Sequence, residues 1–494
     1  MKERGKFARN ASASVMQSLF GAVLLFALYR YINMALGVEQ LGVWSVVLAT
    51  VAASHLADLG LSAGVTRFVA RDRARGQDTK AGQIIDTVVL TMAVLVALLG
   101  WPLFILGKTL LPLFFHGDHL SLALDVLPLA LLSLWLTMLS TVLQGGLDGC
   151  QRMDLRAGMV LFGQTVLLGM AIWLVPIYGL TGLALAQVAQ GSLLLVLGRL
   201  LLCRVMPSLP IFPGCWDKKA LREMLSYGMN MQAATILVLL FDPAAKALMA
   251  RFGGAAAAGY FEMANQVVVK VRGIVIAANQ AIVPYVAEMQ EVADNELRDI
   301  YAKNFRILIL VVIPVFSVLL VWAGVISWLL LGEMNIQLIS LLGFLTVAWG
   351  INVFNAPAYF FNMGTGRVGW NTLCHLMMAS ISIILGFTLG SYYGMMGVAV
   401  GYGVAIIFGS ISLILAFGVV NRVAVLPIIW HMRGIFACLP VGIFGFLAVP
   451  LYPLDTIYFM LLSAVALTGL ICLIALLHPT GRQVVDRMRH RMIR

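Results

Sequence analysis

The sequence predicts an all-α integral membrane protein with about 14 transmembrane helices. Its composition, its recurring apolar stretches and the placement of its basic residues carry this prediction. Of 494 residues, 61% are hydrophobic and only 11% are charged, and the mean hydropathy is +0.96. Soluble domains carry roughly 25% charged residues. Apolar stretches of the roughly 20 residues that a membrane-spanning helix needs recur along the whole chain.

The predicted spans are separated by short joints. In chain order they are residues 10–36, 41–65, 84–106, 121–144, 157–176, 180–202, 229–250, 260–285, 307–331, 337–361, 371–391, 394–419, 434–451 and 455–477. The first span is too long for the core of a cleavable signal, so we expect it to remain. The longest joint, 203–228, begins Pro-rich and ends amphipathic, which indicates a cytoplasmic linker leading to a helix on the membrane surface.

The basic residues indicate how the chain is oriented in the membrane. Of the 33 Lys and Arg residues, 27 fall in the termini, in the joints on one side of the membrane or, for Arg199, in the end of a span on that side, and only Lys108 and Arg251 fall in joints on the other. Basic residues accumulate on the cytoplasmic side, so both termini are predicted to be cytoplasmic. The net charge of +11 therefore reflects topology and does not indicate nucleic-acid binding. The remaining basic residues lie inside spans: Arg30, Lys246, Lys270 and Arg272.

The two halves of the chain resemble each other. "LGVEQLGVWSVVLA" from residue 36 parallels "GGAAAAGYFEMANQ" from residue 253, which aligns Gly37 with Gly254 and Gly42 with Gly259. "YGLTGLALA" from residue 178 parallels "YGMMGVAVG" from residue 393. A duplicated six-helix unit follows, and its pseudo-two-fold axis is expected along the membrane normal. The predicted divisions are an N-terminal lobe 1–202, the linker 203–228, a C-terminal lobe 229–419, and two additional helices with a basic cytoplasmic tail in 420–494.

Catalytic and nucleotide-binding motifs have no suitable context in this chain. "GTGRVG" (364–369) has the dinucleotide-binding spacing, but it falls in a short turn between two predicted spans, with no strand before it. The six cysteines show no metal-ligand spacing, and no Ser–His or Cys–His pair is suggestive. We therefore predict that the protein is not an enzyme and has no catalytic residue, bound metal or cofactor.

The predicted eighth span carries an unusual polar face. Each charge inside a membrane costs at least about 2.5–3.5 kcal/mol, so such residues are candidates for function. Steps of 100° gather them on about half of the helical wheel: Glu262, Asn265, Gln266, Lys270, Arg272, Asn279 and Gln280. Two interpretations stay open, namely structural salt bridges to neighbouring helices, or a hydrated cavity with positive potential.

Other polar residues in spans suggest ion coupling or gating. Asp242 and Lys246 lie four residues apart on the seventh span, which favours an ion pair, and Pro243 between them permits a bend that a gate would use. His55 and Asp58 share a face of the second span, as a proton-coupling pair or as a packed polar cluster. Arg30, in the first span, either extends a cationic lining or snorkels outward.

Several stretches resemble one transporter family. "LGVEQLGVWSVV" followed by "LADLGLSAGVTRFVA" (56–70), together with "FDPAAKALMARFGGAAAAGYFEMANQ" (241–266), resembles the polysaccharide transporters of the multidrug/oligosaccharidyl-lipid/polysaccharide exporter superfamily. The resemblance covers about residues 10–420 in pattern. Such proteins flip polyprenyl-pyrophosphate-linked oligosaccharides across the bacterial inner membrane for lipopolysaccharide O-antigen or exopolysaccharide. The resemblance implies two six-helix lobes around a central cavity that opens alternately to each face.

The resemblance also implies roles for the polar residues. Lys270, Arg272 and Arg30 would attract the pyrophosphate in a low-dielectric cavity. Amides would hydrogen-bond the sugars, from Asn265, Gln266, Asn279 and Gln280. The expected partners are the lipid-linked oligosaccharide, membrane lipids, and a polysaccharide polymerase with its chain-length machinery. A proton or sodium gradient, or the membrane potential, would drive transport.

Three other functions stay open. A peptidoglycan lipid-precursor flippase would also carry two additional helices, which twelve-span drug exporters lack. A cation-coupled multidrug antiporter would want acidic residues to dominate the cavity, whereas the basic residues in the spans are at least as numerous as Asp58, Asp242 and Glu262. A membrane glycan polymerase or ligase would need larger outer loops than this chain has.

Overall fold

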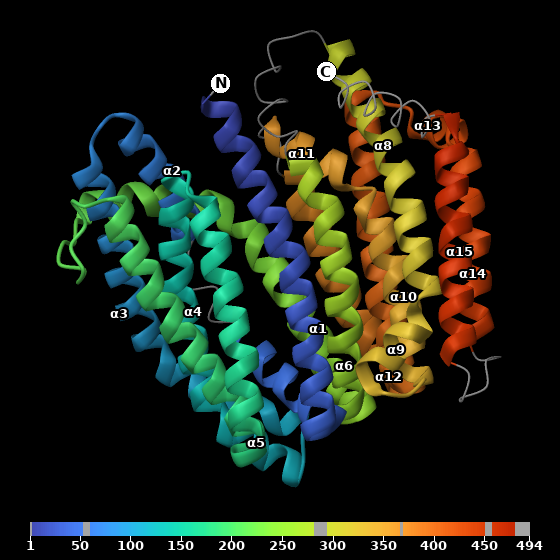
Figure 1. The fold of residues 1–494 in the computed structure, drawn as a ribbon, viewed down its shortest axis with the longest axis horizontal. Helices are drawn as coiled ribbons and strands as arrows, with labels where there is room; N and C mark the ends of the chain where they lie inside the picture. Colours follow the sequence, from blue (N-terminus) through green and yellow to red (C-terminus); the bar gives the residue numbers. More distant parts are fainter. Residues whose placement is uncertain (1, 53–59, 281–293, 366–368, 450–456, 480–494) are drawn as a thin grey trace. The chain divides into compact units, whose positions relative to one another are not determined.

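The computed structural model describes residues 2–52, 60–280, 294–365, 369–449 and 457–479 (Figure 1). Within these ranges the chain forms helices joined by short turns, and no strand occurs there. Eight of the described helices are long and apolar enough to cross a membrane, or nine if one bent pair is counted as a span. The predicted all-α membrane fold is confirmed.

The chain separates into two compact units, Met1–Gly259 and Tyr260–Arg494. The first contains α1 (Lys2–Val51), α2 (Leu61–Ala74), α3 (Asp78–Leu110), η2 (Leu111–Leu113), α4 (Asp118–Gly149), α5 (Met153–Val205) and the start of α6 (Lys218–Gln280). The second contains the rest of α6, α8 (Asp294–Val321), α9 (Ala323–Leu331), α10 (Ile336–Val353), α11 (Ala356–Gly364), α12 (Gly369–Asn421), α13 (Val425–His431), η4 (Arg433–Ala437), α14 (Cys438–Ala448) and α15 (Ile457–Leu477). The division of the chain into lobes at 203–228 stays a prediction.

The longest helices are helical hairpins broken at a glycine. A helix of 53 residues, the length of α5 and of α12, would be about 80 Å long, which is more than twice the thickness of the hydrocarbon core. Both helices break where the backbone φ is positive, at Gly179 (φ 56°, ψ −135°) and Gly394 (φ 59°, ψ −141°). Glycine adopts this conformation without the steric cost of a Cβ. Each of these helices therefore supplies two of the predicted spans.

A second pair of glycines breaks α1 and α6 in the same way. Gly37 has φ 82° and ψ 165°, and Gly254 has φ 79° and ψ 179°. These glycines are aligned by the internal repeat, as are Gly179 and Gly394, and the dihedral angles within each pair agree to within about 15°. The duplication seen in the sequence thus extends to the backbone geometry of its turns.

The repeated turns are followed by close backbone contacts that only glycine permits. A Cβ on Gly42 would overlap the Ala255 carbonyl oxygen, and a Cβ on Gly259 would overlap that of Val38. The two contacts are reciprocal, because residues 38–42 and 255–259 are equivalent in the repeat. They hold the two turns against each other within the first unit.

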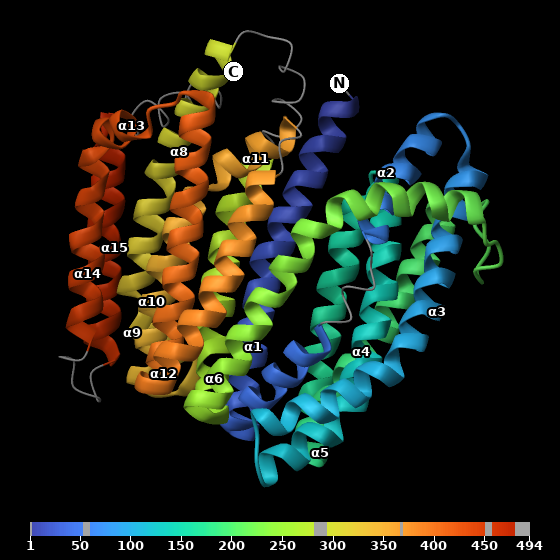
Figure 2. The same ribbon diagram turned by 180° about the vertical axis from the view of Figure 1, so that it is seen from behind.

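Some predicted spans consist of two helical pieces. The ninth divides into α8 and α9 at Trp322, and the tenth into α10 and α11 at residues 354–355. The thirteenth falls on η4 and α14, and the segment Arg433–Ala448 is bent by 62° from α13, which precedes the predicted span. The predicted surface helix at the end of the linker is continuous with the seventh span, because α6 is helical from Lys218 onward (Figure 2, green).

The first part of the predicted linker is bonded to the first unit. Arg199 on α5 donates to Asp86 Oδ1 on α3 at 2.7 Å and to the carbonyl oxygens of Ile211 and Pro210 at 2.9 and 2.5 Å. The Gly214 N–H donates to Asp86 Oδ2 at 3.2 Å. This buried ion pair therefore holds residues 210–214 against α3 and α5.

The second part of the linker is bonded as well. Trp216 Nε1 donates to Thr91 Oγ1 at 3.1 Å, and Arg71 on α2 forms ion pairs with Asp72 and Glu223. The hydrogen bonds to Asp72 and then to Glu223 raise the pKa of the Arg71 guanidinium above its usual range. The start of α6 is thus tied to α2.

The additional helices pack closely onto the second unit. Gly442 on α14 lies against Ser317 on α8, where a Cβ would be 2.9 Å from the Ser317 Cα. Trp322 Nε1 donates to Thr468 Oγ1 on α15 at 2.8 Å. Small residues allow such close approach of helices in a membrane, so α14 and α15 form part of the packed unit.

Candidate functional site

The second part of α6 brings the predicted polar face into the C-terminal unit. Arg272 lies there half-buried, with its guanidinium carbon 4.5 Å from the centre of the Trp349 ring on α10. Its Nε donates to Asn352 Oδ1 at 2.9 Å. A guanidinium over an indole face is stabilised by the ring quadrupole, and the effect grows when water is excluded. Arg272 is therefore held by an aromatic face and a neutral amide.

A chain of buried hydrogen bonds orients Asn352, the amide that accepts from Arg272. Asn352 Nδ2 and Asn355 Nδ2 both donate to Ser410 Oγ, at 2.8 and 3.3 Å, and Ser410 donates to the Ile406 carbonyl at 2.6 Å. A hydroxyl donates once and accepts twice, so Ser410 uses its full capacity. Because the Asn352 amide N–H points at Ser410, its carbonyl oxygen faces Arg272.

Trp349 is fixed by a residue of the predicted polar face. Its Nε1 donates to Asn265 Oδ1 at 3.1 Å, and both residues are buried. Asn265 therefore supports the ring on which Arg272 rests. The next residue, Gln266, donates from Nε2 to Glu262 Oε1, one helical turn earlier, at 3.0 Å.

The two basic residues of the eighth span have no acidic partner in the described structure. Lys270 is exposed, and no carboxylate among the described residues lies within 4.0 Å of its Nζ or of the Arg272 guanidinium. The described residues thus supply no salt bridge to Lys270 or Arg272, and both interpretations drawn from sequence stay open.

The seventh span behaves differently. Lys246 Nζ lies 2.8 Å from Asp242 Oδ2, and both residues belong to the part of α6 in the first unit. This is the intrahelical ion pair that the spacing favours. Arg30 lies half-buried on α1, also in the first unit. Roles in gating or in substrate binding stay predictions for these residues.

Four predicted site residues lie outside what the structure describes. His55 and Asp58 fall in the range 53–59, which is not described. Asn279 and Gln280 belong to the last turn of α6, and their side chains are not described. Their predicted roles are untested, as is the predicted central cavity between the lobes.

The sequence analysis missed the residues that hold Arg272. Trp349, Asn352 and Asn355 follow one another along α10 and its end, and Ser410 lies on α12. The available signal was the spacing of three between Trp349, Asn352 and Asn355, which puts polar groups on one face of an otherwise apolar span.

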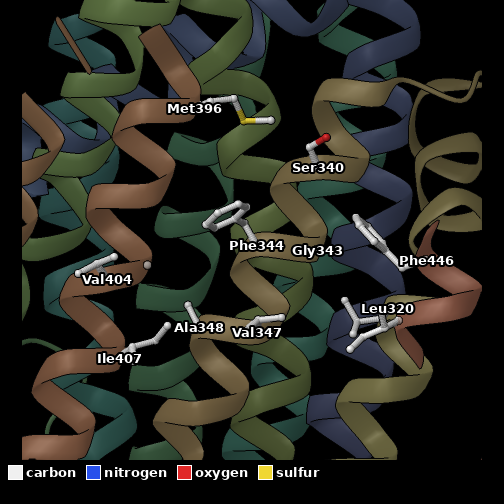
Figure 3. A pocket seen from close by; sticks show the side chains of 12 residues that line it. Leu320, Ser340, Gly343, Phe344, Val347, Ala348, Met396, Val404, Ile407 and Phe446 are labelled. Carbon is white, nitrogen blue, oxygen red and sulfur yellow. The ribbon is translucent and has the colours of Figure 1, made fainter. Parts of the chain in front are cut away.

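A separate cavity of about 420 Å³ lies among α8, α10, α12 and α14 (Figure 3). Phe344, Val404, Ile407 and Phe446 dominate its walls, and Ser340 contributes a hydroxyl. No basic or acidic side chain lines it. It cannot hold a charged headgroup and is distinct from the Arg272 site.

The fold has close counterparts among solved transporters. The inward closed structure of the lipid II flippase MurJ matches with a TM-score of 0.71 at 12% identity, covering 98% of this chain and 99% of that one. An inward-facing MATE family multidrug transporter of the MOP superfamily matches with a TM-score of 0.64 at 15% identity, covering 84% and 98%. A Vibrio cholerae MATE transporter gives 0.60 at 17% identity, with 84% and 98% covered.

The chain therefore has the fold of the MurJ flippase and of the MATE transporters of the MOP superfamily. The sequence profile described as Polysaccharide biosynthesis protein matches residues 7–290. The chain belongs to this family, as its sequence patterns led us to expect. Comparison with curated protein sequences gives no match.

Proposed function

We propose that this protein flips a polyprenyl-pyrophosphate-linked oligosaccharide across the bacterial inner membrane, with both termini in the cytoplasm, and that it is not an enzyme. Its product would serve O-antigen or exopolysaccharide assembly. Lys270 and Arg272 receive the pyrophosphate, and neighbouring amides hydrogen-bond the sugars.

One observation carries the proposal: the basic side chains of the eighth span are not neutralised by any described carboxylate. An unpaired charge inside a membrane protein is costly unless water or an anion reaches it. The Arg272 Nε donates to Asn352, and neither of the two terminal guanidinium nitrogens makes a hydrogen bond to the described residues. They can donate in pairs to phosphate oxygens.

The extent of the shared fold favours a flippase over a drug exporter. The MurJ structure matches 98% of this chain, whereas the MATE structures match 84%. This difference in the covered share of the chain is explained if α14 and α15 have counterparts in the flippase and none in the drug exporters. An antiporter for cationic drugs would also gain nothing from Lys270 and Arg272, since like charges repel.

The driving force follows from the charge that moves. If bound anionic charge crosses the membrane, the potential contributes about 2.3 kcal/mol per charge per 100 mV. Coupling to protons or sodium is the alternative, and His55, Asp58 and the Asp242–Lys246 pair are the residues to vary for it.

The test is export of surface polysaccharide by cells that carry Lys270→Ala, Arg272→Ala or both, with protein levels matched. We expect each single variant to lose at least about tenfold in export, because a hydrogen bond to a charged group contributes about 1.5–3 kcal/mol. Normal export by the double variant would refute the proposal.

Arg433→Gln is the matched control. The Arg433 guanidinium lies 5.1 Å from the centre of the Trp430 ring, so the variant removes the same kind of cation–π contact, but at a position outside the repeat. Export should remain at the wild-type level in this variant. A loss as large as that of Arg272→Ala would mean that the assay reports folding and not substrate binding.

A further inference from the structure

A cleft of about 730 Å³ opens in the first unit, at the end that the positive-inside rule places on the side of the membrane away from the cytoplasm. Its walls come from η2, the turn that follows it, the start of α4, and residues 250–255 of α6. The polar side chains in the lining are Arg251, His116 and His119, and the Phe114, Phe115 and Phe252 rings flank them. This volume is in the range of small-molecule sites.

The charge of the lining is positive. Arg251 is one of only two Lys or Arg residues in the predicted outer joints, and no carboxylate belongs to the lining. One carboxylate outside the lining contacts a lining residue: Glu39 Oε2 lies 3.5 Å from His119 Nε2. The one outer arginine is thus placed beside two of the seven histidines of the chain.

Arg251 is positioned but not saturated. One terminal nitrogen donates to the Leu113 carbonyl at 3.3 Å, and the guanidinium lies 5.8 Å from the centre of the Phe252 ring. No other described residue accepts a hydrogen bond from it, and the side chain is exposed. Its remaining N–H groups are available to a ligand in the cleft.

The histidines also leave hydrogen-bonding capacity unused. His119 Nδ1 is buried and has no partner in the described structure, although the Nε2 of the same ring faces Glu39. His116 is exposed, and no described residue bonds it. The exposed His116 ring is therefore the histidine that presents unused hydrogen-bonding atoms to the cleft.

The position of Arg251 depends on the repeat. It lies three residues before the Gly254 turn, which the reciprocal contacts of Gly42 and Gly259 hold in place. The guanidinium is thereby presented by a fixed turn instead of a loose loop. Sites built on such rigid elements bind with less ordering cost.

We propose that this cleft binds a phosphate-type oxyanion, and that it receives the pyrophosphate of the translocated headgroup on the outer side. The inference rests on the proposed function for the source of the anion. Free pyrophosphate and a prenyl-linked pyrophosphate share the chemistry, namely oxygens that accept charge-assisted hydrogen bonds from Arg251 and the histidines.

The experiment measures binding to the purified full-length protein in detergent micelles by calorimetry. Lys270→Ala/Arg272→Ala serves as the background, so that anion binding at the inner site does not contribute. The probes are sodium pyrophosphate, farnesyl pyrophosphate and, as the uncharged reference, farnesol. We expect both pyrophosphates to bind, and Arg251→Gln in this background to weaken them at least about tenfold, because it removes a charged donor.

Two further variants keep the outcome decisive. Lys108→Gln removes the other outer basic residue, which lies 5.1 Å from the Phe104 ring centre and outside the cleft lining, so binding should be unchanged. Arg251→Lys keeps the charge and should bind both pyrophosphates with intermediate affinity. The thermal unfolding midpoint of Arg251→Gln shows whether that variant is folded.

Each result decides the matter. Loss in Arg251→Gln for both probes supports the cleft, and loss for farnesyl pyrophosphate alone assigns it to the lipid-linked form. No binding by the background protein, or an equal loss in Lys108→Gln, overturns the proposal. Normal export by the Lys270→Ala/Arg272→Ala protein would instead refute the proposed role of Lys270 and Arg272, independently of this titration.

Discussion

The buried ion pair between Asp86 and Arg199 offers the sharpest test of how the first unit is held together. Their side chains are 2% and 10% exposed, and the closest N–O distance is 2.7 Å. Among the described residues, replacing Arg199 by Met leaves the carboxylate with only the Gly214 N–H as a donor. It also leaves the Ile211 carbonyl without its side-chain donor and the Pro210 carbonyl with only the Cys203 thiol. Breaking a buried pair on one side costs about 3–5 kcal/mol.

The double variant is expected to behave differently. With Asp86→Leu and Arg199→Met together, neither charge of the pair remains, and such apolar replacements are often neutral or stabilising by about 1–4 kcal/mol. We therefore expect the double variant to be more stable than Arg199→Met alone. A coupling free energy of at least about 1.5 kcal/mol should appear in the double-mutant cycle.

Two measurements check this cycle. Equilibrium unfolding in mixed micelles, followed by far-UV circular dichroism, gives the free energy of unfolding of each variant. Limited chymotrypsin digestion reports on the linker, because Trp216 is 54% exposed and cleavage there should accelerate once residues 210–214 are released. Equal stabilities of the single and double variants, with unchanged cleavage, would refute the reasoning.

Three further changes test other contacts. Trp349→Leu should lower export about 2- to 30-fold, because a cation–π contact contributes about 0.5–2 kcal/mol, while Trp349→Phe keeps a ring and should lose less in the same assay. Gly42→Ala should destabilise the protein by about 1–3 kcal/mol or more in micelle unfolding, because the methyl meets a backbone oxygen; Gly158→Ala, with open space around it, should not. Gly343→Leu should lower the thermal unfolding midpoint by displacing the Phe446 ring, and adding Phe446→Ala should restore part of it; an unchanged midpoint would mean that α14 does not pack here.

The turns and spans could be predicted because their causes are local. The repeat aligned Gly37 with Gly254 and Gly179 with Gly394 in the sequence, and the helices break at these glycines, where φ is positive. Apolar length then set the number of spans. Element ends were less predictable: α6 continues through the predicted surface helix, since nothing in residues 218–228 stops a helix.

The surroundings of Arg272 could not be predicted, because they join residues about 80 positions apart. The wheel placed Asn265 and Arg272 on the same face, but only helix packing shows that Asn265 supports Trp349 and that Arg272 rests upon it. Arg199 shows the same limit. By sequence it counted as a cytoplasmic topology marker, yet its side chain is buried against Asp86, which is 113 residues away.

The linker contacts constrain how the proposed alternation between two open states could proceed. A flexible tether at 203–228 would let the lobes rock, but residues 210–217 are bonded to α3 and α5 through Asp86, Arg199 and Thr87. Any motion that keeps the buried pair intact carries these residues along with the first unit. Releasing them would expose a charge pair that is stable only when both partners are present. For the proposed alternation we therefore expect bending beyond Asp217, where Pro243 lacks the N–H that would continue the hydrogen bonding of α6.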